Sequence, residues 1–128
     1  MDTVVSFAST DFVTHRHCVV GNPMGRMFET HTHGFCEIIF LKEGDVSAII
    51  GEKTYKLTDN SLVIFRANVP HAIKVDSNKN YDRHNIIFDE NKFANSIFNK
   101  ISENLDVVDC NNNDNLIELF EKIDFLLQ

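Results

Sequence analysis

The sequence predicts an all-β barrel or sandwich followed by two α-helices, and three observations support this fold class. Up to Phe88, many short alternating or apolar segments are separated by regular turn signals, which is typical of all-β architectures. After Phe88 the apolar residues recur with the period of an amphipathic helix. The length of 128 residues, with 43% hydrophobic and 24% charged residues, indicates one compact domain with a sizeable core.

The predicted β region consists of a short arm and a series of strands. Residues 1–10 are weakly patterned and are interpreted as an N-terminal arm, and residues 11–88 as the barrel. In the segment 11–20, Thr14 and Arg16 share one face with Phe12, Cys18 and Val20, whereas His15 and His17 share the other. Further strands are expected between turn signals, over residues 46–50, 53–57, 61–65, 72–75 and 85–88.

Two helices are predicted after the barrel. Phe93, Ile97 and Ile101 recur at helical spacing, and Asn115 with Glu118 three residues later resembles a capping box at the start of a second helix. The second helix carries a broad apolar stripe formed by Leu116, Leu119, Phe120, Ile123, Leu126 and Leu127. This stripe either packs on the barrel or pairs with another copy of the chain, and the pattern leaves both interpretations open.

The most informative stretch covers residues 25–44. His31 and His33 lie two positions apart in an extended segment, so both imidazoles point to the same face. Glu37 shares that parity, but a straight strand would place it about 13 Å from His33. Gly34 stands between them and can adopt backbone conformations closed to other residues, so we expect a bend there that returns the carboxylate to the histidines.

The spacing of this stretch resembles the first signature of the cupin superfamily. The matching residues are Gly25, His31, His33, Glu37 and Gly44. The second cupin signature is only partly present: residues 60–71 keep its spacing and its histidine, His71, but carry Asn60, Arg66 and Asn68 in place of glycine, proline and glycine. The resemblance implies a double-stranded β-helix, the RmlC-like jelly-roll barrel, in which His71 joins the first three polar side chains.

Residues 57–71, together with the arm and the two helices, resemble the N-terminal domain of AraC-type transcription regulators. In that family the barrel binds a small effector, often a sugar, the helices mediate dimerisation, and a separate C-terminal domain with two helix-turn-helix units binds DNA. Nothing in this sequence resembles that DNA-binding domain. The resemblance therefore implies a sensor half without enzymatic activity, organised as an arm (1–10), a cupin barrel (11–88) and a helical dimerisation segment (89–128).

A metal-dependent cupin enzyme, such as a dioxygenase or an isomerase, is the alternative function. His31, His33, Glu37 and His71 would then surround iron, manganese, nickel or zinc and leave positions open for substrate. The complete quartet favours the enzyme, whereas the degenerate second signature and the acidic helical tail favour the regulator, which we prefer. In a regulator the same four residues would contact either the effector or a divalent metal.

Three further polar residues are candidates for effector binding. Arg66 occupies a turn near His71. Arg83 and Asn85 alternate with Ile86 and Phe88, so they would face the interior if the apolar pair packs outward under the helices. For both arginines, an ordinary surface position is the preferred interpretation.

Charge and cysteine content exclude several classes of function. The net charge of −7 divides into −1 over residues 1–88 and −6 over residues 89–128, so the chain alone lacks the basic patch that binding to DNA requires. Three cysteines without metal-type or redox-type spacing, Cys18, Cys36 and Cys110, indicate reduced thiols. The acidic N-terminus and the absence of a long apolar run argue against export and membrane insertion, so we expect a cytoplasmic protein.

Overall fold

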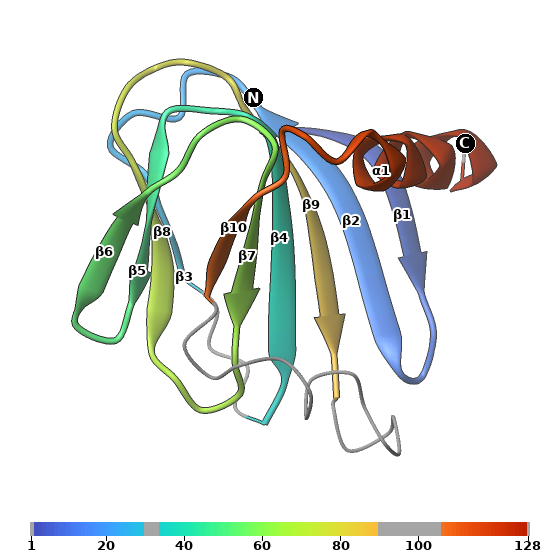
Figure 1. Cartoon of the computed structure of the whole chain (residues 1–128), viewed down its shortest axis with the longest axis horizontal. Coiled ribbons are helices and arrows are strands. Elements are labelled where there is room, and N and C mark those ends of the chain that lie inside the picture. Colours follow the sequence, from blue (N-terminus) through green and yellow to red (C-terminus); the bar gives the residue numbers. More distant parts are fainter. Residues whose placement is uncertain (1, 30–33, 90–105, 128) are drawn as a thin grey trace.

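A computed structural model describes residues 2–29, 34–89 and 106–127 of the chain (Figure 1). These residues form ten β-strands and one α-helix. The elements are β1 (Asp2–Ser9), β2 (Val13–Val20), β3 (Met27–Glu29), β4 (Cys36–Glu43), β5 (Val46–Ile50), β6 (Lys53–Lys56), β7 (Ser61–Phe65), β8 (His71–Val75), β9 (Tyr81–Phe88), β10 (Val107–Asp109) and α1 (Asp114–Leu127). Within this described part, no helix has the length and the apolar character that crossing a membrane requires.

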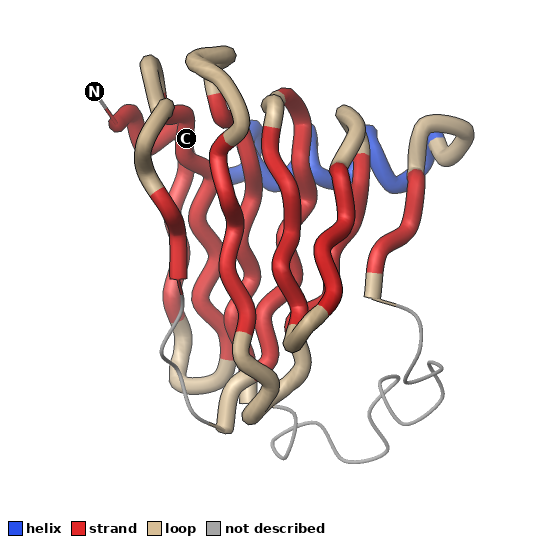
Figure 2. Tube along the Cα trace, turned by 90° about the vertical axis from the view of Figure 1, so that its left-hand side faces the viewer, coloured by secondary structure: helices blue, strands red, loops and turns tan. Residues whose placement is uncertain are grey.

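The strands form two antiparallel sheets that face each other. One sheet has six strands in the order β1-β2-β9-β4-β7-β10, and the other has four in the order β3-β8-β5-β6. In Figure 2 the four-stranded sheet stands in front, and α1 runs behind the strands, on the far side of the six-stranded sheet. The six-stranded sheet is therefore covered on both faces, by the other sheet and by the helix.

Strand β4 shows how the sequence produces this arrangement. Ile39 and Leu41 belong to the main core between the sheets, whereas Phe40 belongs to a second apolar cluster with Phe120 of α1. Successive residues of a strand point to opposite faces, so a strand buried on both faces must be apolar at consecutive positions. The apolar run in β4 meets this requirement.

The main core is built from both sheets. Its buried members are Val20, Ile39, Leu41, Val46, Ala48, Ile50, Leu57, Val63, Phe65, Ile73, Val75 and Tyr81. Gly44 lies against this core, because a Cβ atom there would come within 3.2 Å of Leu41 and 3.3 Å of Tyr81. The three cysteines are buried thiols, in agreement with the expected reduced state.

Asn60 and Asn68 stand where the second cupin signature has glycine, and both have left-handed backbone angles, with φ of +63° and +64°. Asparagine is among the few residues other than glycine that adopt this region readily. The two replacements therefore preserve the backbone turns of the signature although they change its residue types.

The N-terminal segment differs from the predicted arm, because Asp2–Ser9 is a strand, β1, at the edge of the six-stranded sheet. It pairs with β2 from Asp2 opposite Val20 to Ser9 opposite Thr14, with an irregularity between Val4 and Ser6. An edge strand that is exposed along much of its length needs no strict apolar alternation, so its sequence pattern is weak.

The C-terminal segment confirms one predicted helix but corrects its start. The amide of Leu116 donates to Asn113 Oδ1 at 3.0 Å, so Asn113 is the N-cap and the predicted capping box at Asn115 is two residues late. The helix expected around Phe93 to Ile101 lies outside the described residues. Strand β10, which pairs with β7, precedes α1 and was not anticipated.

The apolar stripe of α1 is divided between two environments. Phe120 is 5% exposed, and Leu116 and Ile123 pack around it against the six-stranded sheet. Leu119 and Leu126 are 52% and 76% exposed. Of the two interpretations that the sequence left open, packing on the barrel therefore holds for Leu116, Phe120 and Ile123, which cover the chain's own sheet.

Candidate functional site

A cavity of about 420 Å³ opens on the inner face of the six-stranded sheet, where β3 of the other sheet meets it. Its walls combine charged, polar and apolar side chains from five strands. The lining residues are Phe7, Thr14, Arg16, Met27, Phe28, Glu37, Arg83, Asn85 and Ile87. Concave sites of this size and mixed character are typical of small-molecule binding.

Glu37 is the buried acid of the cavity, with 4% of its surface exposed. The amide of Asn85 donates to Glu37 Oε2 at 3.0 Å. The second carboxylate oxygen lies 3.7 Å from His71 Nε2. Glu37 and Asn85 come from the neighbouring strands β4 and β9 and have inward parity, so sheet register alone brings them together.

His71 is held in one orientation at the start of β8. Its Nδ1 lies 2.9 Å from the carbonyl oxygen of Val69, and its ring stacks on Phe65 at a centroid distance of 4.1 Å. An Nδ1–H that donates to this carbonyl leaves Nε2 directed at Glu37. Burial opposes the charged imidazolium, but the Glu37 carboxylate and the Val69 carbonyl outweigh burial and raise the pKa of His71.

Arg83 is the buried cationic residue of the cavity, with 8% of its surface exposed. Its guanidinium carbon lies 4.5 Å from the ring centre of Tyr81 and 5.1 Å from that of Phe28. One terminal nitrogen donates to the Cys18 carbonyl at 3.5 Å, and its Nε has no hydrogen-bond partner among the described residues. A guanidinium carries five N–H donors, and this one lines the cavity, so it can donate to a ligand there.

The remaining predicted site residues separate into two groups. Arg66 does not line the cavity; its Nε lies 4.0 Å from Asp106 Oδ1, just before β10. His31 and His33 lie outside the described residues, so their place relative to Glu37 stays a prediction. The bend expected beside them is present, because Gly34 has a φ of +84°.

Arg83 and Asn85 do face inward, because Ile86 packs in the apolar cluster under α1 on the opposite face of β9. Thr14, Arg16 and Phe28 line the cavity as well but were not predicted as site residues. The sequence held a signal for two of them, since strict alternation already placed Thr14 and Arg16 on the face of β2 that carries the buried Val20.

Several solved structures have similar folds although they are remote in sequence. An RmlC-like cupin family protein with a double-stranded β-helix fold from Methanocaldococcus jannaschii has 14% identity and a TM-score of 0.59, and the match covers 75% of this chain and 87% of that one. The cupin domain of Cnp3 from Schizosaccharomyces pombe has 11% identity and a TM-score of 0.59, with 73% and 71% covered. A cupin 2 conserved barrel domain protein from Salinispora arenicola has 15% identity and a TM-score of 0.57, with 73% and 82% covered.

These likenesses show that the chain has the cupin fold, a double-stranded β-helix, as its sequence predicted. No curated protein sequence matches the chain significantly. The model of one protein family, described as the AraC-like ligand binding domain, matches residues 17–116. That segment contains most of the strands and most of the cavity lining. The chain therefore belongs to the family of AraC-like ligand binding domains.

Proposed function

We propose that this chain is the sensor domain of an AraC-type transcription regulator and binds a small polar effector in the cavity between its sheets. The family supports a ligand-binding role. The observation that carries the proposal is the buried set of Glu37, Asn85 and Arg83, which supplies acceptors and donors to a cavity of about 420 Å³. Charged and polar groups that are buried beside a cavity are costly to stability, so we attribute their presence there to ligand binding.

The lining favours a polyhydroxylated effector such as a monosaccharide. A carboxylate accepts hydrogen bonds from hydroxyl groups, and a guanidinium and an amide donate to them. Phe28 and Phe7 add apolar surface to the same cavity, on which the C–H face of a sugar ring can pack. We assign Glu37, Arg83 and Asn85 to effector binding on this basis, and we retain His31, His33 and His71 beside them as predictions. Arg66 remains a weaker candidate because it lies outside the cavity lining.

Calorimetric titration with a panel of neutral monosaccharides and sugar acids tests this function. We expect one member to bind, and Glu37→Gln and Arg83→Met each to weaken its binding about tenfold or more, because each removes a charged hydrogen-bonding partner. Lys53→Met, at an exposed position on β6, is the control and should leave the affinity unchanged. Equal affinity in all three variants would show that the effector binds elsewhere.

The enzyme alternative depends on a metal in the same cavity. His71 Nε2 and Glu37 Oε1 lie 3.7 Å apart, and His71 Nδ1 is held by a backbone carbonyl, as is common for metal-bound histidines. These two side chains fit zinc, nickel, manganese or iron, with His31 and His33 as further expected ligands. A metal bound there would act as a Lewis acid or would activate oxygen or water in a dioxygenase or isomerase.

Elemental analysis of the untagged chain, with His71→Ala beside it, separates the two functions. Suppose that the chain contains a stoichiometric metal, that His71→Ala loses it, and that the chain turns over a small substrate. These results together would support the enzyme and contradict the sensor. Effector binding that persists after removal of metal by a chelator would support the sensor.

We also propose that α1 mediates dimerisation, through the residues that its own sheet leaves exposed. Leu119, Phe125 and Leu126 are 52%, 79% and 76% exposed. A second copy of the chain would bury them, as the resemblance to AraC-type regulators implies. Leu119→Lys with Leu126→Lys should yield monomers in light scattering, whereas Asn115→Lys, at an exposed polar position of the helix, should not. A wild-type chain that is monomeric at high concentration would contradict this interface.

DNA binding is assigned to a different domain of such a regulator. The near-neutral barrel and the acidic C-terminal segment should give this chain no salt-dependent affinity for duplex DNA. A mobility shift at physiological salt would require a DNA-binding surface within the chain itself. We place the protein in the cytoplasm as part of the same proposal.

A further inference from the structure

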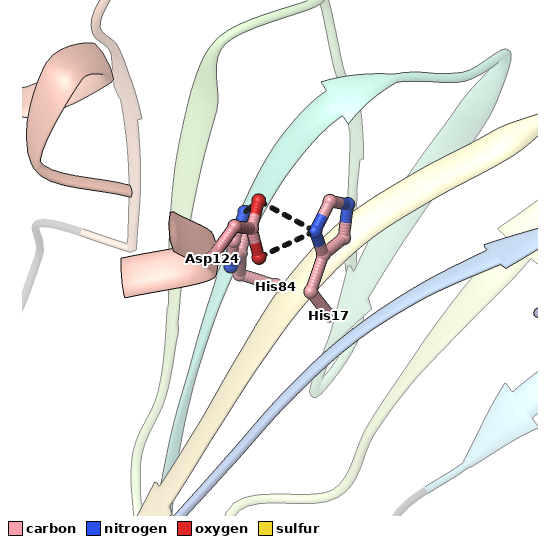
Figure 3. A group of neighbouring side chains, drawn as sticks. All are labelled: His17, His84 and Asp124. Carbon is pink, nitrogen blue, oxygen red and sulfur yellow. Dashed lines mark hydrogen bonds and ion pairs between the residues drawn. The ribbon is translucent and has the colours of Figure 1, made fainter. Parts of the chain in front are cut away.

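A second polar cluster lies on the outer face of the six-stranded sheet, under α1. His17 on β2 and His84 on β9 are opposite each other in the strand register, and their rings stack at a centroid distance of 4.0 Å. Asp124 of α1 approaches both histidines (Figure 3). One ligand atom from each of the three residues lies within 4.8 Å of the other two. We call these three residues the outer cluster.

Each member of the outer cluster is oriented by a residue behind it. His17 Nε2 lies 2.5 Å from Asp82 Oδ1, and His84 Nδ1 lies 2.9 Å from His15 Nε2. The hydroxyl of Ser6 donates to Asp124 Oδ1 at 2.7 Å. A metal-bound histidine almost always uses its second nitrogen in this way, in contact with a carboxylate or another polar group. The remaining atoms, His17 Nδ1, His84 Nε2 and the carboxylate of Asp124, converge on one another.

Within the outer cluster, His84 Nε2 is the ring nitrogen without a hydrogen-bond partner among the described residues. His84 is fully buried, and its Nε2 has no hydrogen-bond partner among the described residues although Asp124 Oδ2 lies 3.6 Å away. If His84 Nδ1–H donates to His15, the lone pair of Nε2 faces a carboxylate oxygen across this gap. Two acceptors that face each other in a buried site repel, and a cation between them removes the repulsion.

Two members of the outer cluster have the protonation state of a metal ligand, and the third would have to lose a proton. Burial, followed by the neighbouring His17, lowers the pKa of His84. Burial would raise the pKa of Asp124, but hydrogen bonds from Ser6 and His17 lower it. Burial opposes the charged form of His17, but hydrogen bonds to Asp82 and Asp124 raise its pKa. Metal ligands must be deprotonated, so zinc would have to displace a proton from His17.

We propose that His17, His84 and Asp124 bind one zinc ion that fastens α1 to the outer face of the six-stranded sheet. Two imidazole nitrogens and one carboxylate oxygen form a donor set that zinc prefers, and a water molecule completes four-coordination. This site uses none of the cavity residues, because β9 directs His84 outward and Arg83 inward. It is therefore separate from any metal held by Glu37 and His71 and independent of the proposed effector.

Zinc binding is measured on the full, untagged chain after removal of metal. The reference is the double variant Glu37→Gln with His71→Ala, which removes two of the four expected cavity ligands and so weakens competition from the cavity. We expect one equivalent of zinc in this reference by elemental analysis, and a rise in its thermal unfolding midpoint, because a ligand that binds only the folded state must stabilise it. Cobalt in place of zinc should give the visible absorption of a tetrahedral nitrogen and oxygen site.

Adding Asp124→Asn to the reference should abolish the bound equivalent and the cobalt spectrum. Glu121→Gln, at an exposed position of the same helix, is the matched control and should retain both. Asp82→Asn changes only the support of His17, so it should keep the stoichiometry and weaken zinc about 10- to 100-fold. Circular dichroism checks that each variant is folded. If Asp124→Asn does not fold, the zinc affinity of Asp82→Asn decides whether the outer cluster is the binding site.

Three outcomes would overturn the proposal. They are a reference chain that binds no zinc, an Asp124→Asn variant that binds it as tightly as the control, and an Asp82→Asn variant with unchanged affinity.

Discussion

The two faces of the six-stranded sheet both bury charged side chains, but they satisfy them differently. On the inner face, Glu37 and Arg83 border a cavity of about 420 Å³, and Arg83 Nε is without a hydrogen-bond partner among the described residues. On the outer face, α1 covers His17, whose two ring nitrogens contact Asp124 and Asp82. Polar side chains beside open volume indicate ligand binding, whereas side chains that converge beneath a helix indicate a structural role, which the proposed zinc would complete at His84 Nε2.

A single strand supplies both faces. In β9, Arg83 and Asn85 point into the cavity, and His84 and Ile86 point toward α1. The register with β2 places His84 opposite His17 and Arg83 opposite Cys18. A slip of one residue would exchange the two sets, so the apolar packing that fixes this register also keeps the cavity and the outer cluster apart.

The largest expected effect is on the outer face, at Phe120. Its ring stacks on Phe40 with a centroid distance of 4.4 Å and an interplanar angle of 2°, and it is 5% exposed. Phe120→Ala should lower the free energy of unfolding by about 3 kcal/mol, because it leaves a cavity beneath α1. Urea denaturation measures the change.

Phe125→Ala is the control for this substitution, because Phe125 lies on the same helix and is 79% exposed. It should change the free energy of unfolding of the monomeric chain by less than about 0.5 kcal/mol. Equal losses in the two variants would mean that α1 does not pack on the sheet through Phe120.

A smaller effect is expected at the start of α1. Asn113 Oδ1 accepts a hydrogen bond from the amide of Leu116. Asn113→Ala should lower the free energy of unfolding by about 1 kcal/mol, since a free helix amide loses its partner. Asn112→Ala, one residue outside the cap, should have no measurable effect in the same urea titration. If Asn115→Ala proves the more damaging change, the helix begins where its sequence predicted.

On the inner face the effects on stability and on binding should diverge. Arg83→Met keeps an unbranched side chain against Phe28 and Tyr81. It removes a buried charge whose Nε has no hydrogen-bond partner among the described residues. Its free energy of unfolding should therefore change by less than about 1 kcal/mol, in either direction. Calorimetry with the effector identified from the sugar panel should show binding weakened about tenfold or more. A stability loss as large as that of Phe120→Ala would make Arg83 structural.

The fold was predictable because its signals are local. Alternation located most of the strands, and the helical period of the apolar residues located α1. The edge strand β1 was not predicted, because it is exposed along much of its length. The N-cap of α1 was placed wrongly, because several asparagines precede the helix. In both places the local pattern is compatible with more than one structure.

The sites were less predictable because their residues meet only through tertiary packing. Glu37 and Asn85 are far apart in sequence, yet they come together because β4 and β9 are neighbours in the sheet. Sheet register alone does not assemble the outer cluster, because Asp124 reaches His17 only after α1 packs on the sheet. Alternation had placed His15 and His17 on one face of β2, but nothing in the sequence indicated which helix residue would cover them.

The smallest effect is expected at the exposed end of the four-stranded sheet, where Lys56 contacts Asp45 and Asp76. The Lys56 side chain is 56% exposed, so solvent screens these ion pairs, unlike the pairs of the outer cluster. Hydrogen bonds from Lys56 lower the pKa of Asp45 and of Asp76 below the ordinary value of 3.8. A lowered carboxyl pKa stabilises the folded state above pH 3.8, and this contribution is lost as the pH falls through the folded pKa.

Lys56→Met should therefore lower the thermal unfolding midpoint at neutral pH by less than about 2 °C, and high salt or about pH 3 should reduce the difference further. Thermal scans of both proteins at two pH values and two salt concentrations measure it. A larger loss that survives high salt would show that this exposed network is as important to the fold as the buried one beneath α1.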